Sequence, residues 1–180
     1  MGLLHWARQK SPWIVHFDCN SCNGCDIEVL AALTPVYDAE RFGVVNQGNP
    51  KHADILVVTG SVNHRNIRVL RNIYSQIPAP KAVVAIGACA CSGGIFAEAY
   101  NVMGGVDHAI PVDVYVPGCS VRPEAVLDGV VKATAALSDP QAQKRHREFL
   151  EKLQGGALPD DFGPDSIEPT QMKEAAAHAG

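Results

Sequence analysis

Six cysteines are the residues of this 180-residue chain whose type and spacing could do chemistry. Three of them fall within seven residues, two more lie close together near the middle of the chain, and the last stands alone. In order they are Cys19, Cys22, Cys25, Cys89, Cys91 and Cys119. Thiolates are soft, negatively charged ligands that suit zinc and iron–sulfur groups. The chain therefore predicts a metal-binding site built from cysteines.

Each cysteine group directly follows a short apolar run that is typical of a β-strand. Residues 13–17 precede the first group, 83–86 the second and 112–116 the third. In an open parallel sheet, the loops after the carboxyl ends of the strands lie along one edge, where α/β folds bind their ligands. We therefore expect cysteines that are remote in sequence to meet at this edge. The first three would lie on a loop at a strand-to-helix junction.

The rest of the pattern alternates strands with helices along the chain. Further strand-like runs cover 42–45, as an edge strand, and 53–60, as a buried strand. Apolar residues at helical spacing cover 26–33, 66–77 and 124–137. Such alternation is typical of an α/β fold, with an open parallel sheet and helices on both faces.

Composition divides the chain into three parts. We expect an N-terminal segment over 1–12 and one α/β domain over 13–137. Residues 138–180 have few apolar positions and predict a peripheral C-terminal part. Within it, 141–154 predicts a charged helix, and 155–180 has no core pattern and would be disordered or lie on a partner.

Charge and hydropathy exclude several classes of partner. The net charge is −4 and no block of Lys or Arg occurs, which argues against nucleic acid and anionic lipid as partners. No run approaches the roughly 18 to 20 apolar residues that span a bilayer, so we expect membrane attachment only through other subunits. Residues 1–10 lack the features of an export signal. We therefore expect a cytoplasmic location and reduced thiols.

Four of the cysteines could converge on one cluster. Cys22 and Cys25 form a C-x-x-C pair on one loop, and Cys89 and Cys119 could supply the other two ligands of a four-iron cluster. A structural zinc is an alternative, although zinc ribbons usually bring two C-x-x-C pairs and this chain has one. A thioredoxin-like redox pair would explain neither Cys89 nor Cys119. A plain flavodoxin-like binder of a small molecule would leave all six thiols unexplained.

Several short motifs follow one another in a recognisable order. They are Cys22–Glu28, Arg41–Gly43, His52–Leu56, Gly87–Cys89, Ser92–Gly94, Ile110–Cys119 and Arg122–Glu124. In these blocks, which span residues 11–137, the chain resembles the small subunit of membrane-bound, energy-converting NiFe hydrogenases of the Ech, formate hydrogenlyase and CO-induced types. The same blocks resemble the homologous iron–sulfur subunit of NADH:quinone oxidoreductase, complex I.

The resemblance implies a flavodoxin-like open parallel sheet, with the cluster loops at the carboxyl ends of the strands. It also implies one 4Fe-4S cluster, whose ligands fall on Cys22, Cys25, Cys89 and Cys119 of this chain. The C-x-x-C pair favours the hydrogenase branch, because complex I subunits have adjacent cysteines, with a cysteine in the place of Gly24.

Two features depart from the family pattern. The two prolines that usually follow the last cysteine are Ser120 and Val121 here, which loosens that turn without removing the ligand. Cys19 and Cys91 are additional thiols that we expect not to be ligands. Cys91 is close enough to Cys89 to be a rival ligand, because the two are separated by one residue in a glycine-bounded segment.

The function implied by the resemblance is electron relay. The chain would pass electrons between a ferredoxin-like 4Fe-4S subunit and the NiFe centre of a separate large subunit, while integral membrane subunits translocate ions. No catalysis is expected from the isolated chain. One alternative is a complex I subunit that hands electrons to quinone. Another is a non-enzymatic assembly module stabilised by a redox-silent metal.

Other polar residues have both a functional and a structural interpretation. Glu28 lies one turn beyond Cys25 and could belong to a proton route at the partner interface, or be a first-turn carboxylate favoured by the helix dipole. We expect four histidines to be structural or solvent-facing, and two arginines to make structural or interface ion pairs. These are His16, His52, His64 and His108, and Arg41 and Arg122.

Overall fold

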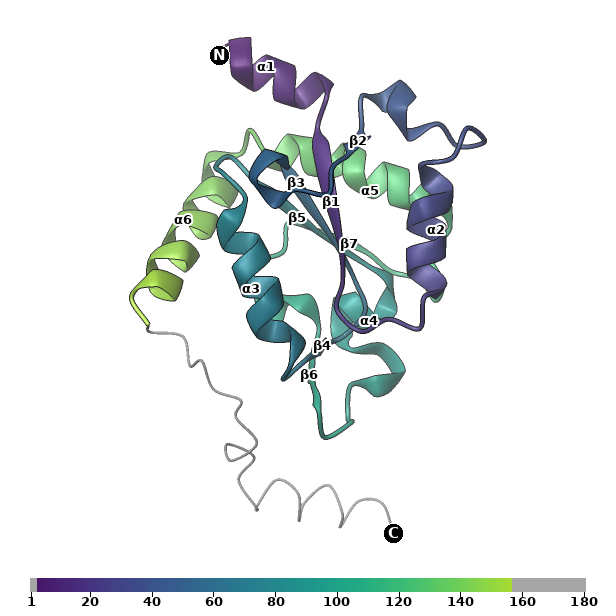
Figure 1. The fold of residues 1–180 in the computed structure, drawn as a ribbon, viewed down its shortest axis with the longest axis vertical. Coiled ribbons are helices and arrows are strands. Elements are labelled where there is room, and N and C mark those ends of the chain that lie inside the picture. Colours follow the sequence, from purple (N-terminus) through teal and green to yellow (C-terminus); the bar gives the residue numbers. More distant parts are fainter. Residues whose placement is uncertain (1–2, 157–180) are drawn as a thin grey trace.

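A five-stranded parallel sheet forms the centre of the computed structural model, which describes residues 3–156 (Figure 1). Its strands are β1 (Trp13–Asp18), β2 (Val45–Asn46), β3 (Ile55–Thr59), β5 (Ala82–Ile86) and β7 (Val114–Val116). They lie in the order β2-β1-β3-β5-β7, and every neighbouring pair is parallel. The first strand along the chain is thus second in the sheet, and the others extend outward from it on both sides. This is the strand order of flavodoxin-like folds, so the predicted fold class is confirmed.

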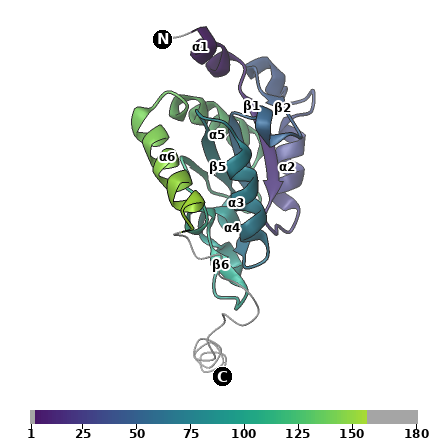
Figure 2. The same ribbon diagram turned by 60° about the vertical axis from the view of Figure 1, so that its left-hand side comes forward.

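Helices cover both faces of the sheet. Helices α2 (Gly24–Ala32) and α5 (Pro123–Ala136) pack on one face, and α3 (Asn66–Gln76) and α6 (Pro140–Gln154) lie on the other (Figures 1 and 2). Successive residues of a strand point to opposite faces, so β3 contributes to two separate hydrophobic cores. All five residues of β3 are buried for this reason, as they are in β5.

The remaining elements are short. Near the N-terminus, α1 (Leu3–Lys10) is attached by an ion pair of 3.3 Å between Arg8 Nε and Asp54 Oδ1. A second sheet of two antiparallel strands, β4 and β6, was not predicted from the sequence. Its strands and the other short elements are β4 (Val62–Asn63), β6 (Val102–Gly104), α4 (Gly87–Ser92), and the 3-10 helices η1 (Ala39–Phe42), η2 (Pro50–His52), η3 (Gly94–Phe96) and η4 (Val106–His108).

Most predicted elements are present, but the edge strand predicted over 42–45 lies at Val45–Asn46, because Phe42 ends the 3-10 helix η1. Two further differences concern the cysteines. Helix α2 begins at Gly24, two residues before the predicted start, so Cys25 belongs to its first turn and not to the loop. The segment that carries Cys89 and Cys91 is a short helix, α4, instead of a loop. It ends at Gly93, whose positive φ of 84° is typical of a glycine that terminates a helix.

Helix α6 is held to the domain more firmly than its charged sequence predicts. Phe149 and Leu150 pack against the core on the α3 side of the sheet. His146, which is 2% exposed, has its Nδ1 atom 2.8 Å from the Tyr74 hydroxyl and its Nε2 atom 2.8 Å from Oδ2 of Asp113. A buried polar group needs such partners, and these lie far away in sequence. The helix is therefore an integral layer of the fold, while residues 157–180 of the predicted tail lie outside the described residues.

Beside this contact, Lys81 is an unusually buried charged residue. Its Nζ atom donates a hydrogen bond of 2.8 Å to the Tyr74 carbonyl and lies 4.4 Å from the centre of the Tyr74 ring. Burial lowers the pKa of Lys81 to about 8. On α6, Gln143 Nε2 donates to the Lys81 carbonyl at 2.9 Å, and the Gln143 side-chain oxygen accepts from the Lys81 backbone N–H at 3.1 Å. These polar contacts join α6 to the start of β5.

We predict that His146→Ala lowers the free energy of unfolding by about 3 kcal/mol. The substitution would take the Tyr74 hydroxyl's partner away and would remove one partner of the buried Asp113 carboxylate, which keeps the Val83 N–H and Arg145. The loss of a buried partner costs roughly 1 to 3 kcal/mol, and truncating a buried side chain adds to it. Urea unfolding of the purified chain would measure the change. Lys144→Ala, an exposed position on the same helix, should alter the value by less than about 0.5 kcal/mol. Equal stability of the two variants would contradict the structural role of His146.

Candidate metal centre

The four cysteines predicted as ligands lie at the carboxyl-terminal edge of the sheet. Cys22 follows β1, Cys89 lies in α4 directly after β5, and Cys119 follows β7. Cys25 stands in the first turn of α2. Cys22 and Cys119 are exposed, whereas Cys25 and Cys89 are half-buried. The parallel sheet therefore brings together thiols that are up to 97 positions apart in the sequence.

The electrostatic interactions among the four thiols show that they are near one another. Burial raises the pKa of the Cys89 thiol, and the charges of Cys119, Cys22 and Cys25 raise it further. Burial also raises the pKa of the Cys25 thiol, an effect that a hydrogen bond from the Val121 backbone opposes and that Asp26, Cys22 and Cys119 reinforce. Bound metal would reverse this balance, because cations favour the thiolate form and release its proton.

Glycines keep space open beside three of the sulfur atoms. A Cβ atom at Gly87 would lie 2.5 Å from Cys25 Sγ, and one at Gly94 would lie 3.0 Å from Cys89 Sγ. At Gly24 the corresponding distance to Cys22 Sγ is 3.4 Å. Gly87 and Gly94 also have positive φ angles, of 90° and 56°, that other residues adopt at a cost. Four thiols, three of them flanked by glycines, fit the donor set of an iron–sulfur cluster.

The thiols do not form a compact site for one ion. Within residues 3–156, no three His, Cys, Asp or Glu side chains are arranged so that they could hold a single metal ion. Four tetrahedral ligands of zinc at about 2.3 Å must crowd around one point. A 4Fe-4S cluster instead places a cube of iron and sulfide between its ligands, so its thiolates stand farther apart.

The two extra cysteines have different surroundings. Cys19 is fully buried in the core, and burial raises the pKa of its thiol to about 12. Cys91 packs against the same core, and its Sγ atom lies 3.6 Å from the Ala85 carbonyl oxygen, to which it donates. Residues two positions apart on an α-helix point about 200° apart, so Cys89 and Cys91 face different sides of α4. These surroundings favour the prediction that neither Cys19 nor Cys91 is a ligand.

Three residues close to the thiols, Ser21, Asp26 and Thr59, were missed by the sequence reasoning. The Asp26 carboxylate contacts Thr59, at the end of β3, and His16, on β1, and it also accepts a hydrogen bond from Ser21. His16 is predicted to be structural, and these contacts agree with that prediction. The position of Asp26 directly after Cys25 was the signal that could have identified it, because an acid so close to predicted ligands needs partners.

The other polar residues that the sequence singled out lie elsewhere. The His52 ring meets the Trp13 ring edge-on at 6.3 Å, and His108 Nδ1 lies 3.2 Å from Asp107. His64 is half-buried directly after β4, and Glu28 is half-buried on α2. Arg122 makes an exposed ion pair of 3.5 Å with Glu124, and the Arg41 guanidinium lies 5.3 Å from the Phe42 ring centre. The proton route through Glu28 remains a prediction.

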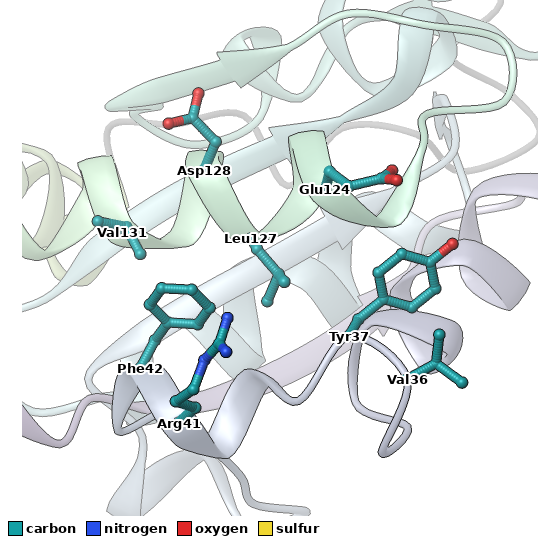
Figure 3. Close-up of a pocket in the computed structure, with 8 residues that line it drawn as sticks. All are labelled: Val36, Tyr37, Arg41, Phe42, Glu124, Leu127, Asp128 and Val131. Carbon is teal, nitrogen blue, oxygen red and sulfur yellow. The ribbon is translucent and has the colours of Figure 1, made fainter.

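A groove of about 540 Å³ lies between the segment 36–42 and the outer surface of α5 (Figure 3). It combines apolar and aromatic side chains with one basic and two acidic residues. Its lining consists of Val36, Tyr37, Arg41, Phe42, Glu124, Leu127, Asp128 and Val131. No cysteine is among these lining residues, so the groove contains none of the predicted metal ligands.

Comparison with known proteins adds a family and several relatives. The profile of the family described as NADH ubiquinone oxidoreductase, 20 kDa subunit, matches residues 22–133, which contain all four predicted ligands. The chain is 54% identical over 129 residues to the probable membrane-bound hydrogenase subunit mbhJ of Pyrococcus furiosus, covering 72% of this chain and 77% of that protein. It is 46% identical over 131 residues to a subunit of the NADH-quinone oxidoreductase of Geotalea daltonii, covering 73% and 75%.

Among solved structures, the fold is similar to a chain of the membrane-bound sulfane sulfur reductase, an archaeal respiratory membrane complex. The TM-score is 0.71 at 35% sequence identity, and the match covers 97% of this chain and 95% of that one. Among residues 3–156, no helix is both long and apolar enough to cross a membrane. The proteins similar to this chain thus include a membrane-bound hydrogenase subunit, an NADH-quinone oxidoreductase subunit and a chain of a membrane-bound sulfane sulfur reductase.

Proposed function

Because the chain belongs to the family of the 20 kDa subunit of NADH ubiquinone oxidoreductase, we propose that it relays electrons through one 4Fe-4S cluster in a membrane-bound NiFe hydrogenase. The observation that carries the proposal is the convergence of Cys22, Cys25, Cys89 and Cys119 at one edge of the sheet. The identity of 54% to a probable membrane-bound hydrogenase subunit supports the hydrogenase branch.

The four cysteines would hold the cluster, which supplies a site that accepts and donates one electron. The chain's own residues fix the thiols in place. Strands β1, β5 and β7 end at the same edge and so deliver Cys22, Cys89 and Cys119 to it, while the first turn of α2 adds Cys25. The N-terminal end of α2, which carries the positive end of the helix dipole, lies at the Cys22–Cys25 turn and would attract a negatively charged cluster. Half-burial of Cys25 and Cys89 limits the access of water to one side of the site.

The exposed side of the site indicates where a partner subunit would bind. Cys22 and Cys119 are exposed, so the cysteine edge would face the NiFe large subunit, because a relay centre must lie close to its electron acceptor. A ferredoxin-like 4Fe-4S subunit would supply electrons, and integral membrane subunits would attach the assembly to the cytoplasmic face of the membrane. The relay domain would comprise residues 13–137 together with helix α6 (Pro140–Gln154), which packs on the α3 side of the sheet. The isolated chain would not turn over hydrogen.

A second candidate is an electron relay in a sulfur-reducing complex of the same architecture. The structural match to the membrane-bound sulfane sulfur reductase covers 97% of this chain, more than the sequence match to the hydrogenase subunit. Its identity is lower, at 35% against 54%. The relay of electrons is common to both candidates, and they differ in the large subunit that receives the electrons.

The test has two steps. The purified holo chain should contain four iron and four sulfide per chain and give an EPR signal on reduction, because four thiolates can each bind one iron of a 4Fe-4S cluster. Zinc, or two iron per chain, would contradict the cluster. The sequence of the co-purifying large subunit then separates the candidates, since a hydrogenase requires two C-x-x-C pairs as nickel ligands. Assays of the complex with protons and with polysulfide as electron acceptors would check that assignment.

A further inference from the structure

We propose that Asp26, with His16, Thr59 and Ser21, forms a positioning network that holds the Cys22–Cys25 turn against the sheet and keeps a negative charge beside the cluster. The inference deepens the proposed function and rests on it. Asp26 would touch neither the substrate nor the cluster. Its effect would pass through the geometry of Cys22 and Cys25 and through its charge.

A single carboxylate connects three segments of the chain. Oδ1 of Asp26 accepts a hydrogen bond of 2.5 Å from the Thr59 hydroxyl at the end of β3, and it lies 3.0 Å from Nε2 of His16 on β1. Oδ2 accepts a hydrogen bond from the Ser21 hydroxyl in the turn before Cys22. The Asp26 side chain is only 13% exposed. The first turn of α2 is thereby tied to two adjacent strands of the sheet.

Further hydrogen bonds to Ser21 and Asp18 hold the turn that contains Cys22. The Ser21 hydroxyl oxygen accepts a hydrogen bond of 2.9 Å from the backbone N–H of Asn23. Asp18 Oδ1 accepts two more, from the backbone N–H groups of Asn20 at 2.8 Å and Ser21 at 2.6 Å. Asn20 and Asn23 have positive φ angles of 114° and 65°, which are uncommon for residues other than glycine and persist only with support. Asp18 supplies that support before Cys22, and Ser21, a member of the network, supplies it after Cys22.

The charge of Asp26 acts on the thiol next to it. Asp26 directly follows Cys25 in the first turn of α2, so its carboxylate lies close to that predicted ligand. A buried carboxylate is costly unless it is well paired, and here three side-chain donors satisfy it. The same charge makes the addition of an electron to a nearby cluster less favourable. A first-turn acid that only stabilised the helix dipole would need none of these donors.

The test uses the holo full-length chain and the isosteric substitution Asp26→Asn. The variant keeps the shape and removes one negative charge, whichever protonation state His16 has. We expect iron content to stay at the wild-type level and the midpoint potential, followed by EPR during a redox titration, to become more positive. The g-values of the EPR signal should also change, because the Cys25 turn loses an acceptor. Glu151→Gln, which removes an exposed charge on α6, should change neither quantity.

A second variant tests the anchoring role separately. Thr59→Val removes one donor to Asp26 at nearly constant volume, and the holo chain should lose iron to a chelator about 10-fold faster because the Cys22–Cys25 turn is less firmly held. This is the lower end of the effect of losing a direct partner of a metal ligand, since Thr59 contacts Asp26 and no ligand. The inference would be overturned if both variants matched the wild type in midpoint potential, in EPR signal and in the rate of iron release. If Asp26→Asn fails to retain iron, faster release from Thr59→Val supports the network and a wild-type rate overturns it. Absence of iron from the wild-type chain would instead be a failure of the proposed function.

Discussion

Replacing Cys89 by serine should remove the iron–sulfur cluster, whereas replacing Cys91, two residues later in the same short helix, should leave it in place. The two side chains point about 200° apart on α4. Cys89 interacts with all three other predicted ligands, while Cys91 interacts only with Cys25 among them, donates to the Ala85 carbonyl and packs against the core. The expected loss in Cys89→Ser is at least tenfold in iron per chain, because a serine hydroxyl is a poor substitute for a soft thiolate.

Iron analysis and EPR of the reduced chain measure this difference directly. Cys91→Ser is the matched control, since it makes the same chemical change on the same helix. Loss of the signal in Cys91→Ser with retention in Cys89→Ser would reverse the ligand assignment. Because metal binding is coupled to the folding of the loops that hold the metal, Cys89→Ser should also reduce assembly of the complex.

Gly87→Ala should be nearly as damaging, although it changes no ligand. Gly87 has a φ of 90°, and an added Cβ atom would come within 2.5 Å of Cys25 Sγ. The backbone conformation alone costs an alanine about 1 to 2 kcal/mol, and the contact requires Cys25 to move. A displaced thiol cannot close the ligand set, so we expect iron per chain to fall at least tenfold. Iron analysis of the reconstituted chain would measure it.

Gly48→Ala is the control for this substitution. Gly48 is exposed, and a Cβ atom there would have no neighbour within 4 Å. The variant should bind iron as the wild type does, with a stability within about 0.5 kcal/mol of it. Normal iron content in Gly87→Ala would mean that the Cys25 sulfur is not confined by the start of α4, and the described geometry of the site would be wrong.

Most of the fold could be predicted from the sequence, because the residue patterns that indicate its strands and helices are local. Strands β3 and β5 are continuous apolar runs, which are typical of strands covered on both faces. Helix α3 buries Ile67, Leu70 and Tyr74 on one side, as the helical spacing of its apolar residues predicts. The position of each cysteine group at the end of a strand was equally visible, and a parallel sheet brings such ends to one edge.

The sequence could not predict which extra contacts complete the structure, because these join residues that have no local pattern in common. Helix α6 is held by His146, which meets Asp113 and Tyr74 from 33 and 72 positions away. Asp26 meets Thr59 across 33 positions.

The role of Cys91 was equally undecided in the sequence, where it was a rival of Cys89. The helical form of α4 separates the two thiols, since residues two positions apart point to different sides of a helix, whereas in an extended segment they share a face. Residue types and spacing thus determined which thiols could act together. The tertiary structure decided which of them face one another, because side-chain direction depends on the local backbone and on packing between distant segments.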